Sequence, residues 1–137
     1  MPTRLNPYLN FRGNAGEAIR FYHAIFGGRL EMTTYAQGGM SRGPEDADLV
    51  MHAQLTAGNG MTLMASDTPS DMPAGSGSAI SISLSGDDEA ELRGYWARLS
   101  DGASILLPLE KAPWGDVFGI LTDRFGIQWM VDIGPDH

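Results

Sequence analysis

The chain has 137 residues, of which 42% are hydrophobic and 19% charged, as expected for one globular domain. Its formal net charge of −8, with only nine scattered Lys and Arg residues, argues against nucleic acids and anionic membranes as partners. The chain has no Cys, which excludes disulfides, thiolate catalysis and zinc–thiolate sites. No apolar run is long enough to span a membrane and no signal-peptide core opens the chain, so we expect a cytoplasmic protein.

The first half of the chain alternates short strand patterns with one helix. Asn14, followed three residues later by Glu17, predicts the capping box of an amphipathic helix that ends at Gly27-Gly28. Gly58-Asn59-Gly60 predicts a hairpin turn. The predicted elements are a strand over 4–10, a helix within 13–28, and strands over 29–36, 48–57 and 61–67.

The second half repeats this order after a polar loop over 67–78. Asp88 predicts the start of its helix, and Pro108 predicts an edge strand or a bulge. Asp123 and Gly126 take the first and fourth places of a type I turn. The predicted elements are strands over 79–86, 103–110, 114–123 and 126–133, with a helix over 88–100.

The repeated order βαβββ predicts an α+β fold of two tandem modules in one domain, residues 1–137. The first module covers about 3–67 and the second about 78–134. One helix can cover only one face of four strands, so we expect the curved mixed sheets to enclose a cleft with their other faces.

Alternation along each strand assigns side chains to the two faces of its sheet. Leu63 and Trp129 are expected on the helix side, as are Tyr8 and Asn10. On the cleft side we expect Met64 and Met130, which occupy matching places in the strand sequences GMTLMAS and GIQWMVD. The other residues expected on the cleft side are Pro7, Leu9, Phe11, Thr62, Ser66, Ser81, Ser83, Ser85, Gln128 and Asp132.

Four segments carry a resemblance to a known family: NPYLNFRGNAGEAIRFYHAIFGG (6–28), VMHAQLTAGNGMTLMASD (50–67), LPLEKAPWGDVFG (107–119) and LTDRFGIQWMVDI (121–133). The chain resembles the PhnB-like branch of the vicinal oxygen chelate superfamily, which includes glyoxalase I, bleomycin-resistance proteins and extradiol dioxygenases. The resemblance implies a glyoxalase-like fold, a homodimer and a ligand cleft. In metal-dependent members, His, Glu or Gln ligands stand on the first and last strands of each module.

Those ligand places fall on Pro7, Met64, Ser81 and Met130, none of which suits a hard or borderline divalent ion. We therefore expect no metal, no cofactor and no metal-dependent glyoxalase or dioxygenase activity. The favoured hypothesis is a metal-independent protein that binds a small, mainly apolar molecule. Its expected ligand contacts are Leu9, Phe11, Gln54, Met64, Ser81, Ser83, Trp114, Gln128 and Met130.

His52 is the one candidate catalytic residue, because alternation places it on the cleft face with Val50 and Gln54. The first alternative is therefore a metal-free isomerase or lyase in which His52 acts as general base. A minor alternative is the 3-demethylubiquinone methyltransferase-like activity named for some PhnB-like sequences. A structural dimer with a collapsed cleft is the third.

Overall fold

The computed structural model describes residues 5–39, 47–58, 60–68 and 80–135. The chain divides into two compact units, residues 1–76 and 77–137, and each is described by itself. Asn59 of the predicted hairpin and most of the predicted loop over 67–78 lie outside the described residues. No helix in the described part has both the length and the apolar character needed to cross a membrane.

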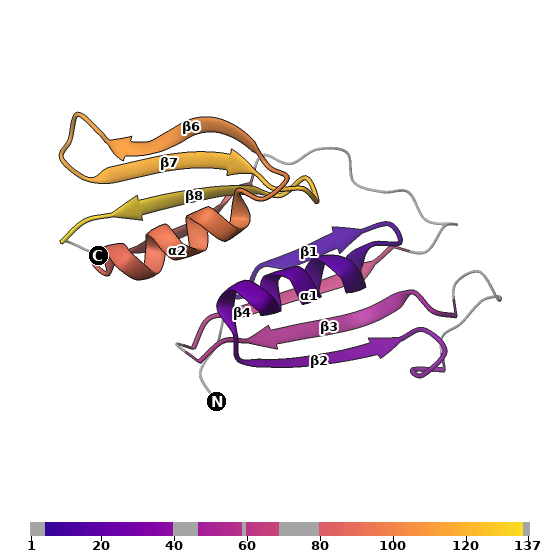
Figure 1. Cartoon of the computed structure of the whole chain (residues 1–137). Coiled ribbons are helices and arrows are strands. Elements are labelled where there is room, and N and C mark those ends of the chain that lie inside the picture. Colours follow the sequence, from indigo (N-terminus) through magenta and orange to yellow (C-terminus); the bar gives the residue numbers. More distant parts are fainter. Residues whose placement is uncertain (1–4, 40–46, 59, 69–79, 136–137) are drawn as a thin grey trace. The chain divides into compact units, whose positions relative to one another are not determined.

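The first unit contains one helix and a four-stranded mixed sheet in the order β1-β4-β3-β2 (Figure 1). The outer strand β1 runs parallel to β4, and the remaining neighbours are antiparallel. Its elements are β1 (Tyr8–Phe11), α1 (Ala15–Phe26), β2 (Arg29–Thr34), β3 (Val50–Thr56) and β4 (Thr62–Asp67). The predicted order βαβββ is confirmed for this unit.

The second unit repeats the topology, with the order β5-β8-β7-β6 and β5 parallel to β8 (Figure 1). Its elements are β5 (Ile82–Gly86), α2 (Glu89–Leu99), β6 (Ser104–Lys111), β7 (Val117–Thr122) and β8 (Gln128–Ile133). The α+β class with two mixed sheets is therefore as the repeat predicts, and neither sheet closes into a barrel.

The core of the first unit lies between α1 and one face of its sheet. The apolar stripe of α1 is buried, and every second residue of β3 and β4 meets it. Burying these side chains supplies most of the driving force for folding this unit. The buried apolar residues of the strands are Leu9, Phe11, Val50, Ala53, Leu55, Leu63 and Ala65.

The predicted orientation of β1 is wrong. Leu9 pairs with Ala65 on the helix side, and Leu9 and Phe11 are only 8% and 6% exposed. Tyr8 instead pairs with Met64 on the opposite face and is 45% exposed. A one-residue shift exchanges the two faces of a strand, and burial of Leu9 and Phe11 beneath α1 decides which register is adopted.

The start of α1 is held by a residue from the far end of the unit. Asp67 Oδ1 accepts hydrogen bonds from the backbone N–H groups of Gly13 and Ala15 at 2.8 and 2.9 Å. Asp67 Oδ2 accepts a third from Val50 N at 3.0 Å. Asn14 stands at the N-cap position, but its side chain makes no capping bond. The predicted capping box is therefore replaced by a carboxylate that ties β4, β3 and α1 together.

In the second unit, buried Trp129 is fixed by a turn carboxylate. Trp129 Nε1 donates to Asp123 Oδ2 at 2.8 Å, while Oδ1 accepts from the backbone of Phe125 and Ile127. Gly126 N donates to Asp123 O at 3.0 Å, which closes the predicted turn. Asp88 accepts from Glu91 N at 3.1 Å, so its predicted role as N-cap of α2 is confirmed.

The outer strand β6 is irregular and apolar. Its register with β7 shifts between Ile105 and Leu107 and again between Leu107 and Glu110, and the second shift includes Pro108. Pro108 was expected on an edge strand or at a bulge, and it lies on both. Ile105, Leu106 and Leu107 are 44%, 57% and 44% exposed in this unit.

We predict that Asp67→Ala lowers the free energy of unfolding by about 3 kcal/mol, because three buried or partly buried N–H groups lose a charged acceptor. The melting temperature should fall by about 10 °C. Asn14→Ala is the matched control and should cost less than about 0.5 kcal/mol, since its side chain makes no cap. Equal losses in thermal melts of the two variants would contradict this account of the helix start.

Candidate functional site

The face of the first sheet opposite α1 carries a mixed polar and apolar surface. Cross-strand pairing aligns Tyr8, Met64, Gln54 and Glu31 in one row across β1, β4, β3 and β2. Of these, Met64 and Gln54 are half-buried. The strands therefore bring together two of the predicted contacts, Gln54 and Met64, and add Tyr8 and Glu31, which were not predicted.

His52 lies on this same face, next to Tyr8. The Tyr8 hydroxyl is 3.5 Å from His52 Nδ1, and the ring centroids are 6.0 Å apart. His52 is half-buried and pairs with Thr33 of β2. The expected position of His52 beside Gln54 is confirmed by this register.

Val50 departs from the predicted pattern of β3. It is buried, and its Cγ2 lies beside Gly16 of α1. The register of β2 and β3 jumps from Thr33–His52 to Thr34–Val50, which leaves Met51 as an extra residue. This bulge turns Val50 to the helix side, so its predicted place on the face of His52 is wrong.

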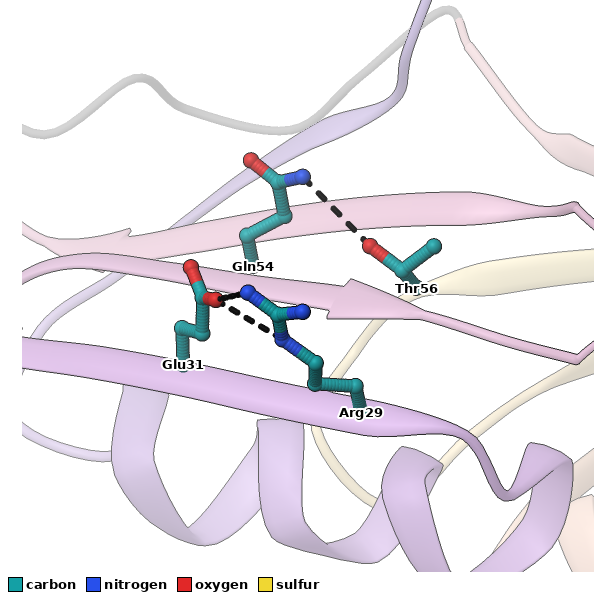
Figure 2. A network of polar contacts seen from close by, with 4 residues as sticks. All are labelled: Arg29, Glu31, Gln54 and Thr56. Atoms are coloured by element: carbon teal, nitrogen blue, oxygen red, sulfur yellow. Dashed lines mark hydrogen bonds and ion pairs between the residues drawn. The ribbon is translucent and has the colours of Figure 1, made fainter.

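Polar contacts along β2 and β3 extend the row toward the outer strand. Figure 2 shows Arg29 and Glu31 of β2, and Gln54 and Thr56 of β3, projecting from the face opposite α1. Arg29 Nε donates to Glu31 Oε1 at 2.9 Å, and Gln54 Nε2 donates to Thr56 Oγ1 at 3.4 Å. Arg29 and Glu31 are well exposed, so their ion pair adds little stability and leaves both groups accessible to a ligand.

The open face of the second sheet, opposite α2, follows the predicted alternation. Ser83 pairs with Met130, which pairs in turn with Ile120 of β7. The Ser81 hydroxyl donates to Gln128 Oε1. Ser81, Gln128 and Met130 are half-buried and Ser83 is exposed. The four predicted contacts on β8 and on the segment of β5 therefore lie on one face.

Trp114 joins this face from the loop before β7. Its ring meets Phe118 edge to face, with centroids 5.5 Å apart and an interplanar angle of 63°. Trp114 is 61% exposed and Phe118 half-buried. Phe118 pairs with Asp132 on β8 and with Glu110 on β6. Phe118 was not predicted as a site residue, although alternation back from Ile120 would have placed it here.

Leu9 and Phe11 do not join either open face. Both were predicted as ligand contacts on the assumption that they faced the cleft, and both are buried beneath α1. Tyr8 takes the place that alternation had given to Pro7, because Tyr8 is the residue paired with Met64. The equivalent partner of Met130 is Ser83 and not Ser81.

The corrected register changes which side chains stand at the places where the resemblance implied metal ligands. The two pairs are Tyr8–Met64 and Ser83–Met130. Two thioethers, a phenol and an aliphatic hydroxyl do not fit a hard or borderline divalent ion. Among the described residues, no three His, Asp or Glu side chains gather closely enough to hold a metal ion.

Comparison with known proteins identifies the family of this fold. Residues 4–131 match the family model of the Glyoxalase/Bleomycin resistance protein/Dioxygenase superfamily. Protein YjdN of Escherichia coli (strain K12) is 29% identical, and the match covers 94% of each chain.

Two solved structures share the fold over nearly the whole chain. Protein PA1353 of Pseudomonas aeruginosa is 40% identical, with a TM-score of 0.83 over 96% of this chain and 98% of the other. A protein from Bacillus cereus described as a putative 3-demethylubiquinone-9 3-methyltransferase, PhnB protein, is 27% identical, with a TM-score of 0.77 over 96% and 100%. The chain belongs to the Glyoxalase/Bleomycin resistance protein/Dioxygenase superfamily.

Proposed function

We propose that this chain is a single glyoxalase-like domain that binds a small, mainly apolar molecule without a metal ion. The observation that carries the proposal is the matching placement of Met64 and Met130. Each is half-buried at the centre of the open face of its own sheet, in the row where metal-dependent relatives would place ligands. Methionine side chains are flexible and polarizable, so they adapt to apolar ligands of different shapes.

Polar residues around each Met would orient the ligand. Tyr8, His52 and Gln54 flank Met64 in the first unit. Ser83 and Gln128 flank Met130 in the second. An apolar floor with a few polar groups is the usual composition of a small-molecule site.

We predict that the neutral probe 1-naphthalenemethanol shifts the methyl NMR signals of Met64 and Met130 in protein labelled at the methionine methyl groups. Met32 is an internal control, because it pairs with Ala53 on the helix side and its sulfur lies 4.0 Å from Arg20 Nη2. Met64→Leu and Met130→Leu would assign the signals. Unmoved Met64 and Met130 signals, or an equal shift at Met32, would contradict binding to the open faces.

The alternative function is metal-free isomerase or lyase chemistry at His52. Nδ1 of His52 faces the Tyr8 hydroxyl, and in the tautomer whose Nδ1–H donates to the Tyr8 oxygen, Nε2 can accept a proton from a carbon or oxygen acid. Imidazole is the side chain that most often serves as a general base, and His52 carries one on the open face of the first sheet.

His52→Gln separates binding from catalysis. Under the binding function, this variant should hold 1-naphthalenemethanol within about tenfold of the wild-type affinity, since it loses one polar contact. Under the general-base alternative, the wild-type protein should speed deuterium exchange of the methyl protons of 2-acetonaphthone in D₂O, and the variant should not. If the wild-type protein accelerates the exchange and His52→Gln does not, the result would support the enzymatic alternative and contradict the binding function.

Methyltransferase activity is a minor alternative, based on the description of the Bacillus cereus relative. S-adenosylmethionine commonly binds at the carboxyl ends of a doubly wound parallel sheet, after a glycine-rich turn. In the described residues each sheet has one parallel and two antiparallel pairings, which does not favour such a site.

The donor chemistry predicts how the protein responds to metal ions. An ion that binds only the native state must raise the melting temperature. Because these side chains do not fit Ni²⁺, Zn²⁺ or Mn²⁺, adding any of the three ions should leave the melting temperature unchanged. Thermal melts with and without the ion measure the effect, and a melt with the ion and excess chelator is the control. A saturable rise that Met64→Leu or Met130→Leu removes would contradict metal independence.

We also propose a homodimer, and the exposed apolar run of β6 supports it. The double register shift and Pro108 disturb the backbone edge of β6, so packing of its side chains would supply the contact in place of strand pairing. The cytoplasmic location expected from the sequence stays a prediction.

Leu106→Glu should convert the proposed dimer to a monomer, because it places a charge in the middle of the apolar run. Light scattering after size-exclusion chromatography measures the mass directly. Ala97→Glu, at an exposed position of α2, is the control and should leave the dimer intact. A monomeric wild-type protein, or an unchanged dimer in Leu106→Glu, would contradict the assignment.

A further inference from the structure

The open face of the second unit carries aromatic rings between carboxylates. Phe118 on β7 stands between Asp132 of β8 and Glu110 of β6, its directly opposed neighbours. Directly opposed residues have Cβ atoms about 5 Å apart and side chains on the same face, so both carboxylates lie beside Phe118. Trp114 meets the same ring edge to face.

From this arrangement we propose that the second unit binds a small organic ammonium ion with an aromatic body, held by Trp114, Phe118, Asp132 and Glu110. The inference rests on the proposed small-molecule function and names its ligand class. Aromatic faces attract organic cations, and Trp provides the strongest such contact among side chains. The carboxylates supply the opposite charge at the rim of the rings.

The exposure of these groups favours an external ligand. Trp114 is 61% exposed although it is the largest side chain type, while Trp129 of the same unit is 1% exposed. Phe118 and Asp132 are half-buried, and Asp132 Oδ1 is shielded from solvent. A partly shielded carboxylate attracts a cation more strongly than one in open water.

The neighbouring charges agree with a cationic ligand. Lys111 opposes Val117 and therefore points to the other face of the sheet from Glu110. Met130 and Ile120 lie in the adjacent row and would contact the apolar body of the ligand. The net charge of −8 further raises the local concentration of cations.

Three naphthalene probes of the same shape test the charge preference: 1-naphthylmethylamine, 1-naphthalenemethanol and 1-naphthoate. The ammonium should bind about tenfold tighter than the alcohol, and the carboxylate more weakly than both. Titrations would follow the Trp114 indole N–H signal, assigned with Trp114→Phe. The Trp129 indole, which donates to Asp123, is the internal control. The preference for the ammonium should weaken as salt is added.

Charge-removing variants identify the groups responsible. Asp132→Asn and Glu110→Gln keep the side-chain shapes, and each should bring the ammonium-to-alcohol affinity ratio closer to one. Glu17→Gln removes an exposed carboxylate of α1 in the first unit and should leave the ratio unchanged. Trp114→Ala should weaken binding of both the ammonium and the alcohol, since the apolar contact is lost with the ring.

The outcomes separate this inference from the function on which it rests. A ratio near one in the wild type, or a ratio that neither carboxylate variant changes, would overturn the ammonium class. Shifted Met64 and Met130 methyl signals with the alcohol would then still support small-molecule binding. If none of the three probes moves the Trp114, Met64 or Met130 signals, both proposals fail.

Discussion

Each helix of this chain covers only one face of a four-stranded sheet, and this limit governs the rest of the structure. A residue on the covered face must be apolar and buried, whereas its neighbour in the strand is turned to the open face. Leu63 and Met64 illustrate the division in β4, as Trp129 and Met130 do in β8. The same strands therefore supply both the core and a candidate binding surface. A shift of one residue in the register of a strand would exchange its buried side chains with those on the open face.

Two buried carboxylates hold this arrangement in place. Asp67 is 2% exposed and joins the end of β4 to the start of α1 and of β3. Asp123 is 4% exposed and joins the turn before β8 to the indole of Trp129. Both accept hydrogen bonds from fixed donors, so their charges are satisfied within the fold.

The sequence predicts the fold well because its strongest signals are local. Alternation places Ser81, Ser83, Gln128 and Met130 correctly, and glycine and Asp signals locate the turn at 123–126. The orientation of β1 fails because its apolar residues fit either face when the strand is taken alone. The repeat aligned Leu9 with Ser83, whereas pairing shows that Tyr8 is the equivalent of Ser83.

The candidate site was less predictable because it depends on pairing between distant strands. Neither the contact of Tyr8 with His52 nor the flanking of Phe118 by Asp132 and Glu110 follows from spacing along the chain. The helix start held by Asp67 is a similar case, since residues 13 and 67 are brought together only by the sheet. Alternation along the strands placed Met64 and Met130 on the open faces, but their neighbours on those faces are known only from the pairing of the strands.

Tyr8, Met64, Ser83 and Met130 stand on the first and last strands of their modules, at the places where the resemblance leads us to expect the ligands of metal-dependent relatives. The proposal that this chain binds its ligand without a metal depends on the absence of carboxylate and imidazole donors from these four places. Native mass spectrometry of unheated protein tests the claim most directly. The account predicts protein that carries an organic molecule or none, with no stoichiometric transition metal. A species with one nickel, zinc, manganese or iron ion per chain would contradict it.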